Sequence, residues 1–222
     1  MRTLYHWWLD PFSRKVRLLL AEKGLEFDIL VEKPWERRHE FLAMNPEGSV
    51  PVLVEDESTT ICGGQVIAEF IEERYTRPNL LGASLEQRAE TRRLIHWFDH
   101  KFYLEVTDNL LNEKVLKRFT DKGGPHSGAI RAGHHNIQTH LQYVEYLTER
   151  NNWLAGDDFS LADITAAAHL SAIDYIGDVP WRSFKEAKNW YAKVKSRPSF
   201  RSILSDHIPG MPPPRHYADL DF

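Results

Sequence analysis

Residues 45–54 read Asn-Pro-Glu-Gly-Ser-Val-Pro-Val-Leu-Val, and they decide how the first third of the chain folds. The Asn-Pro pair, a glycine and a second proline end any preceding helix, and an apolar, β-branched run follows them. Pro51 opens this run, where a proline is tolerated in a sheet. Because cis peptides occur at X-Pro bonds in tight turns, the Val50–Pro51 bond is a candidate cis peptide whose bend lets the Val50 backbone pair with an extended ligand. On these ten residues alone, an ordinary loop-to-strand junction is the simpler interpretation.

The surrounding residues predict a compact α/β domain over residues 1–76. Its pattern is strand, helix, strand, short helix, two strands and helix, and the first two strands are expected to be parallel with a right-handed helical crossover. The expected elements are residues 4–8, 12–23, 27–31, 37–43, 52–54, 59–61 and 65–75. A βαβ unit followed by a ββα unit predicts one sheet with helices packed against it.

Residues 85–207 predict a second, all-α domain, because no strand pattern recurs after residue 76. Helices are expected at residues 85–119, 130–149, 161–175, 190–195 and 199–204, and a mobile loop at residues 120–133. Ser160 and Asp163 form a capping box before the helix at 161–175, which is rich in alanine and leucine and therefore suited to the domain centre. Residues 208–222 are a Pro-rich C-terminal tail that favours an extended, polyproline-type path.

Composition excludes several classes of protein. The net charge of −4 argues against a general nucleic-acid binder and gives no attraction to anionic membranes. One cysteine, Cys62, excludes an internal disulfide and fits a reducing compartment. No signal-peptide pattern opens the sequence, and no apolar run has transmembrane length. We therefore expect a cytoplasmic protein without membrane insertion.

Three stretches resemble motifs of the glutathione transferase superfamily. Residues 10–17, Asp-Pro-Phe-Ser-Arg-Lys-Val-Arg, are similar to the family's first strand-turn-helix segment, residues 45–53 to its cis-proline segment, and residues 160–163 to the capping box of its helical domain. The resemblance extends from residue 4 to about residue 204. It implies a thioredoxin-like α/β N-terminal domain, an all-α helical C-terminal domain, and a homodimer.

The resemblance also implies a glutathione site that has lost its chemistry. The family places a Ser, Cys or Tyr near the first turn to stabilise the glutathione thiolate, but Asp10 holds that position here. A carboxylate beside a thiol raises the thiol pKa by like-charge repulsion. Gly63 and Gly64 stand where an acidic-Ser pair would hold the γ-glutamyl end, so Val50 and Pro51 remain without their chemical partners. We expect a vestigial ligand site and no transferase activity, although a bare helix N-terminus can still attract an anion weakly.

A narrower resemblance is to non-catalytic bacterial cell-division proteins of this fold that bind filaments of the tubulin-like protein FtsZ. Three features carry it: residues 35–38, Trp-Glu-Arg-Arg; the site that lacks its chemical partners; and the Pro-rich C-terminal end, Tyr-Ala-Asp-Leu-Asp-Phe. It implies regulation of constriction at the division site, with a short recognition peptide on a proline spacer. The residues expected to contact the partner are Trp35, Arg38, Tyr217, Asp219, Leu220, Asp221 and Phe222. A tail that packs back on its own domain is an equal alternative.

The enzyme alternative is an active glutathione transferase that acts on small electrophiles or peroxides. Ser13 is then the candidate catalytic residue, although a serine in the first turn of a helix is more often a cap. Glutathione is expected as a cofactor only under this alternative. His96 and His100 have metal-ligand spacing on a helix, but without a third ligand we interpret them as ordinary surface histidines and predict no metal site.

Overall fold

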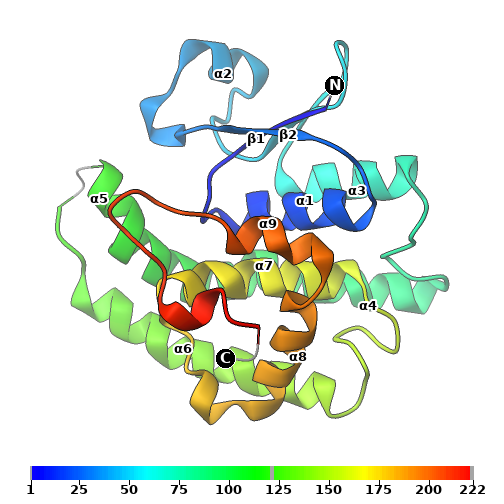
Figure 1. The fold of residues 1–222 in the computed structure, drawn as a ribbon, viewed down its shortest axis with the longest axis vertical. Helices are drawn as coiled ribbons and strands as arrows, with labels where there is room; N and C mark the ends of the chain where they lie inside the picture. The colour runs from blue at the N-terminus through cyan, green and yellow to red at the C-terminus, as the bar shows by residue number, and fades with distance from the viewer. Residues whose placement is uncertain (1, 121–122, 221–222) are drawn as a thin grey trace.

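The computed structural model describes residues 2–120 and 123–220, and its first part is built on a four-stranded sheet (Figure 1). The strand order is β2-β1-β3-β4. Strands β1 and β2 are parallel with Leu4 opposite Ile29, and β3 is antiparallel to both of its neighbours. These pairings confirm the predicted parallel unit and hairpin. The strands are β1 (Thr3–His6), β2 (Asp28–Val31), β3 (Val52–Val54) and β4 (Thr60–Cys62).

Helices α1 and α3 form a layer between the sheet and the helical part of the molecule (Figure 1). Helix α2 lies on the other side of the sheet, at the top of the view. Asp10 caps α1, and the helix begins at Pro11, one residue before the predicted start at residue 12. The helical segments of this part are α1 (Pro11–Glu22), the 3₁₀ turn η1 (Pro34–Glu36), α2 (His39–Met44) and α3 (Gly64–Arg74).

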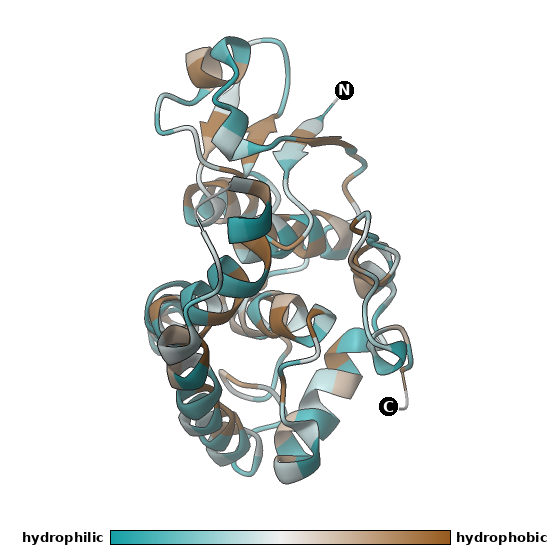
Figure 2. Cartoon of the chain, turned by 90° about the vertical axis from the view of Figure 1, so that its left-hand side faces the viewer, coloured by the Kyte–Doolittle hydropathy of each residue, from teal (hydrophilic) through white to brown (hydrophobic). Residues whose placement is uncertain are grey.

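The second part is all helical, with α7 (Leu161–Tyr175) at its centre. Every residue of α7 is buried, and the predicted Ser160–Asp163 capping box is present. Figure 2 shows hydrophilic residues on the outward faces of the surrounding helices. No helix in the described residues is both long enough and apolar enough to cross a bilayer. The other segments are α4 (Leu85–His96), the π-type η2 (Trp97–Leu116), α5 (Lys117–Thr120), α6 (Ser127–Thr148), η3 (Trp181–Ser183), α8 (Lys185–Lys195), η4 (Pro198–Phe200), α9 (Arg201–Leu204) and η5 (Arg215–Tyr217).

The prediction of a mobile loop at 120–133 is wrong for its second half, because α6 begins at Ser127. The side chain of His126 caps the helix by accepting the Ala129 N–H at 3.1 Å. Gly133 lies inside the helix, where a Cβ atom would be 2.7 Å from the Leu110 side chain. This glycine therefore serves the close approach of α6 and η2, and it does not mark a loop.

Buried charges on α1 hold the two parts together. Arg17 makes a bidentate ion pair with Asp206, with N–O distances of 2.8 and 2.9 Å, and Arg14 contacts the same carboxylate at 3.3 Å. Lys15 pairs with Asp99 of η2. Because removing one partner of a buried pair leaves an unpaired charge, these contacts fix the position of α1 against the helical part.

Candidate functional site

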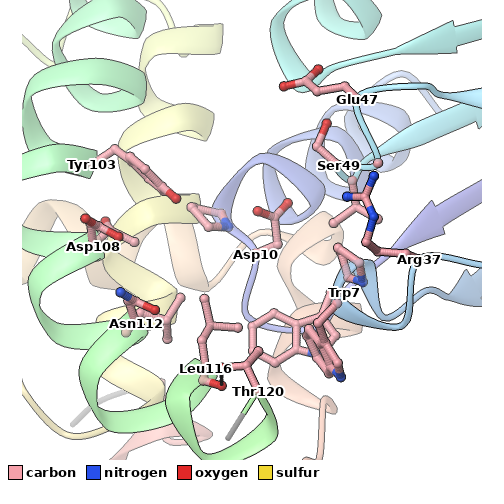
Figure 3. Close-up of a pocket in the computed structure, with 17 residues that line it drawn as sticks. Trp7, Asp10, Arg37, Glu47, Ser49, Tyr103, Asp108, Asn112, Leu116 and Thr120 are labelled. Carbon is pink, nitrogen blue, oxygen red and sulfur yellow. Dashed lines mark hydrogen bonds between the residues drawn. The ribbon is translucent and has the colours of Figure 1, made fainter. Parts of the chain in front are cut away.

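A pocket of about 410 Å³ lies between the two parts of the molecule, at the start of α1 (Figure 3). The loop before β3 and the segment around η1 form one wall, and η2 and α5 form the other. Trp7 lies at its lower end, and the Asp10 side chain lies between the two walls. The polar and aromatic lining residues are Trp7, Asp10, Trp35, Arg37, Glu47, Ser49, Tyr103, Thr107, Asp108, Asn112 and Thr120.

The predicted cis peptide between Val50 and Pro51 is confirmed. Gly48 turns the chain with φ of 74°, which glycine adopts without steric cost, and its N–H donates to the Asn45 carbonyl at 2.9 Å. The Asn45 amide then donates to the Ser49 carbonyl at 2.8 Å. Val50 lines the pocket, whereas Pro51 lies behind it and its carbonyl accepts the Gly63 N–H at 3.0 Å.

Asp10, and not Ser13, faces the pocket. The Asp10 carboxylate accepts the Ser13 N–H at 2.6 Å as the cap of α1. Burial raises the pKa of this carboxyl to about 7, against the hydrogen bonds from Ser13 that favour its ionised form. Ser13 is fully buried, and its hydroxyl oxygen accepts the Trp7 N–H at 3.4 Å. The pocket therefore presents the carboxyl group of Asp10 at the position where transferase activity requires a group that stabilises a thiolate. The hydroxyl group of Ser13 points into the core.

Gly63 and Gly64 start α3 but do not line the pocket. Gly63 has φ of 89°, a conformation that other residues adopt only with strain. A Cβ atom on Gly64 would lie 2.9 Å from the Phe12 Cβ, with the Phe12 backbone directly behind it. The first turn of α1 thus occupies the space in which a serine side chain would stand.

Replacing Gly64 with serine is therefore expected to destabilise the protein by about 1–3 kcal/mol, because α1 must shift to admit the side chain. The measurement is urea unfolding. A Gly124→Ser variant is the control, since a Cβ there meets nothing within 4 Å and is expected to change stability by less than about 0.5 kcal/mol. Unchanged stability in Gly64→Ser together with acquired glutathione binding would contradict this account of the site.

An aromatic cluster joins the two walls of the pocket. Trp35 stacks on Phe119 of α5 with a centroid distance of 5.6 Å and an interplanar angle of 19°. Trp7 meets both rings edge-on, at 5.7 Å and 6.3 Å. Sequence reasoning missed Phe119 as a residue of this cluster, because the sequence shows it only as an aromatic residue at the end of a predicted long helix. In the structure its side chain is 41% exposed. The neighbouring Arg38 is exposed and pairs with the buried Glu32 at 2.5 Å.

The C-terminal tail is packed as far as Asp219. Tyr217 is fully buried, and its hydroxyl oxygen accepts from Arg14 at 2.9 Å and donates to the Ile203 carbonyl at 3.2 Å. Lys195 donates to the carbonyl oxygens of His216 and Asp219 at 3.0 and 2.5 Å. Figure 1 shows this segment (red) crossing the helical part near α7. Tyr217 therefore anchors the tail, which corrects its assignment as a partner contact.

The residues that follow this anchor, 218–220, are exposed. Leu220 is 43% exposed, as a partner-binding residue would be. Asp221 and Phe222, the last two residues predicted to contact a partner, lie outside the described residues. Of the predicted contact residues, the structure leaves Arg38, Asp219 and Leu220 exposed and Trp35 half-buried at the pocket.

His96, His100, His140 and Cys62 have ordinary structural positions. His96 and His100 stack at 5.1 Å, and no group of three or more His, Cys, Asp or Glu side chains suited to a metal occurs in residues 2–120 and 123–220. His140 accepts from the Trp97 indole at 3.0 Å and contacts Glu105 at 3.0 Å. Burial raises the pKa of the Cys62 thiol, which makes it a poor nucleophile at neutral pH.

Comparison with known proteins gives consistent matches along the chain. Residues 11–74 match the model of the glutathione S-transferase N-terminal domain, and residues 135–198 match that of its C-terminal domain. The chain is 52% identical to FtsZ-localized protein A of Caulobacter vibrioides, over 100% of this chain and 98% of that protein.

Two solved structures are similar over the full length. FzlA from C. crescentus has a TM-score of 0.97 and 52% identity, with 100% of this chain and 99% of that chain covered. A protein from Rhodospirillum rubrum F11, described as a glutathione S-transferase, has a TM-score of 0.98 and 57% identity, with 100% of both chains covered.

Proposed function

This chain belongs to the glutathione S-transferase family, and we propose that it is a non-catalytic member that binds FtsZ filaments and regulates bacterial cell division. The observation that carries the proposal is the 52% identity to FtsZ-localized protein A, which extends over the whole chain. The C-terminal tail, which lies outside both family models, is included in that match. The protein acts in the cytoplasm, at the division site.

The chemistry of the pocket supports a non-catalytic role. A carboxyl group with a pKa of about 7 is a stronger acid than a thiol, whose ordinary pKa is about 8.5. Because the carboxyl ionises before the thiol does, a thiolate in the pocket would face the negative charge of Asp10, which raises the pKa of the thiol. The buried Ser13 hydroxyl does not reach the pocket.

The name of the R. rubrum structure supports one alternative, an active glutathione transferase for small electrophiles or peroxides. A thiol-transfer assay with glutathione separates the two functions. Turnover that disappears in Ser13→Ala would contradict the non-catalytic proposal.

We propose that the Trp35–Arg38 segment and the end of the tail each contact the partner. Arg38 is exposed and belongs to the segment that also carries Trp35 at the mouth of the pocket. The chain end alternates the acidic residues Asp219 and Asp221 with the apolar residues Leu220 and Phe222. The charges can steer the tail toward the partner, and the apolar side chains can then anchor it. Two copies of the chain, as a homodimer, present two such surfaces and so can link neighbouring filaments.

The test is co-sedimentation with GTP-assembled FtsZ, comparing the intact chain with Arg38→Gln. We expect the intact chain to pellet with filaments and Arg38→Gln to bind about fivefold to tenfold more weakly, because an arginine at an interface centre contributes strongly to affinity. Arg150→Gln removes an exposed arginine that pairs with the exposed Glu149, and it serves as the control for the loss of one positive charge. An Arg38→Gln variant that pellets as well as the intact chain would remove this segment from the proposed surface.

A further inference from the structure

We propose that the interdomain pocket binds a small organic cation with an aromatic or apolar body, in place of the anionic tripeptide glutathione. This inference does not depend on the FtsZ proposal, because it rests on the charges and shape of the pocket alone. The pocket-lining charges are Asp10, Arg37, Glu47 and Asp108.

The charged side chains around the pocket give it a negative character. Asp10 comes from the start of α1, Glu47 from the loop before β3, and Asp108 from η2, so the carboxylates surround the cavity from different elements (Figure 3). Arg37 is the cation that lines it. Within residues 2–120 and 123–220, none of these carboxylates has a basic nitrogen within 4 Å, and the buried Lys15 is committed to Asp99.

The walls supply the apolar surface that a cation with an aromatic body requires. Trp7 lies at one end, with the Trp35 ring 5.7 Å from it, and Tyr103 lies at the other end. Leu111 and Leu116 complete the side formed by η2. Tryptophan and tyrosine faces attract ammonium and guanidinium groups through the negative face of the ring. The volume of about 410 Å³ is within the range of sites that enclose a small organic molecule.

The same features disfavour glutathione. At neutral pH this tripeptide carries two carboxylates and one ammonium group, and the family activates it as a thiolate. The start of α3, where the family holds one of these carboxylates, does not line the pocket, and Phe12 occupies the space that a side chain on Gly64 would need. Glu47 lies on one wall and Asp108 on the other, and their negative charges repel an anion that enters the pocket.

Asp10 makes the binding dependent on pH. Its pKa of about 7 is raised by burial and by the negative charge of Asp99, and lowered by Ser13 and Lys15. The same field acts on Tyr103, whose pKa is raised to about 12 by burial and by Asp10 and Asp108. Arg37 also lines the pocket, and the buried His169, whose pKa is lowered by burial, contacts Asp99 at 3.1 Å. As pH rises through 7, Asp10 ionises and attraction for a cation increases.

The test uses tryptamine as the cation and indole-3-propionate as the anion of similar size, with binding measured by isothermal titration calorimetry at pH 6 and pH 8. We expect tryptamine to bind at least about tenfold more tightly than indole-3-propionate at pH 8, and its affinity to fall severalfold at pH 6. Equal affinities for the two indoles, preference for the anion, or no measurable tryptamine binding would overturn the proposal.

Three variants locate the binding. Asp10→Asn retains a side chain that can cap α1 and is expected to remove the pH dependence and weaken tryptamine binding about tenfold. Asp108→Asn changes an exposed residue with little risk to folding and is expected to weaken binding about threefold. Glu57→Gln removes an exposed carboxylate in the turn between β3 and β4 and should leave binding unchanged. Tryptamine affinity that is insensitive to both Asp10→Asn and Asp108→Asn would place the ligand elsewhere and overturn the proposal.

Discussion

Replacing Tyr217 with alanine is expected to lower the free energy of unfolding by about 3–5 kcal/mol, the usual cost of removing a fully buried aromatic ring. The ring packs edge-on against Tyr175 at a centroid distance of 5.1 Å, and the hydroxyl group bonds to Arg14 and to the Ile203 carbonyl. Its removal leaves a cavity under the tail and takes one acceptor from a buried guanidinium. Urea unfolding measures the loss.

Two further variants separate packing from hydrogen bonding at this position. Tyr217→Phe keeps the ring and is expected to cost about 1–3 kcal/mol, because one buried Arg14 N–H loses its acceptor. Leu220→Ala changes a residue that is 43% exposed and is expected to cost less than about 0.5 kcal/mol. If Tyr217→Ala were as stable as Leu220→Ala, the tail would not be anchored through Tyr217 in solution.

Deleting residues 218–222 is expected to abolish co-sedimentation with FtsZ filaments while lowering the thermal unfolding midpoint by no more than about 4 °C. The cut falls directly after the Tyr217 anchor, so the buried ring and the bond from Lys195 to the His216 carbonyl are retained, and the bond from Lys195 to the Asp219 carbonyl is lost. What is lost is the end of the chain with its acidic and apolar residues, and affinity for the partner is expected to go with it.

The Leu220→Ala variant tests one side chain of the deleted segment, because it removes that apolar group and keeps the length and charge of the tail. We expect it to reduce pelleting partially, to an extent between those of the intact chain and the deletion. Full co-sedimentation by the folded deletion variant would show that the tail does not bind FtsZ.

Local signals predicted most of the fold. The capping box of Ser160 and Asp163 placed α7 at its observed bounds, and the Val50–Pro51 turn placed β3 at Val52–Val54. Each of these features is encoded within a few residues, through side-chain hydrogen bonds to nearby backbone or through the fixed φ of proline.

What the sequence did not predict depends on contacts between distant residues. The sequence pattern assigns Gly133 to a loop, whereas in the structure it lies in a helix with the Leu110 side chain packed against it. The sequence around Tyr217 has the composition of a recognition peptide. The structure shows instead that Tyr217 contacts Arg14, in another part of the chain. The stacking of Trp35 on Phe119, which shapes the pocket, likewise joins residues from the two separate parts of the molecule.

At the candidate site, the sequence indicated which side chains were replaced but not how they are arranged. Asp10 was identified, yet its orientation into the pocket and its raised pKa follow from burial at the junction of the two parts. Glu47, Asp108 and Tyr103 carry no motif and become neighbours only through the fold.

The most direct test of a non-catalytic, FtsZ-binding protein is the fraction of the intact chain that sediments with GTP-assembled FtsZ as the FtsZ concentration is raised, at physiological salt. The account predicts saturable co-sedimentation, with the chain left in the supernatant when FtsZ is omitted. A chain that stays in the supernatant at every FtsZ concentration, while it turns over glutathione with an electrophile, would contradict it.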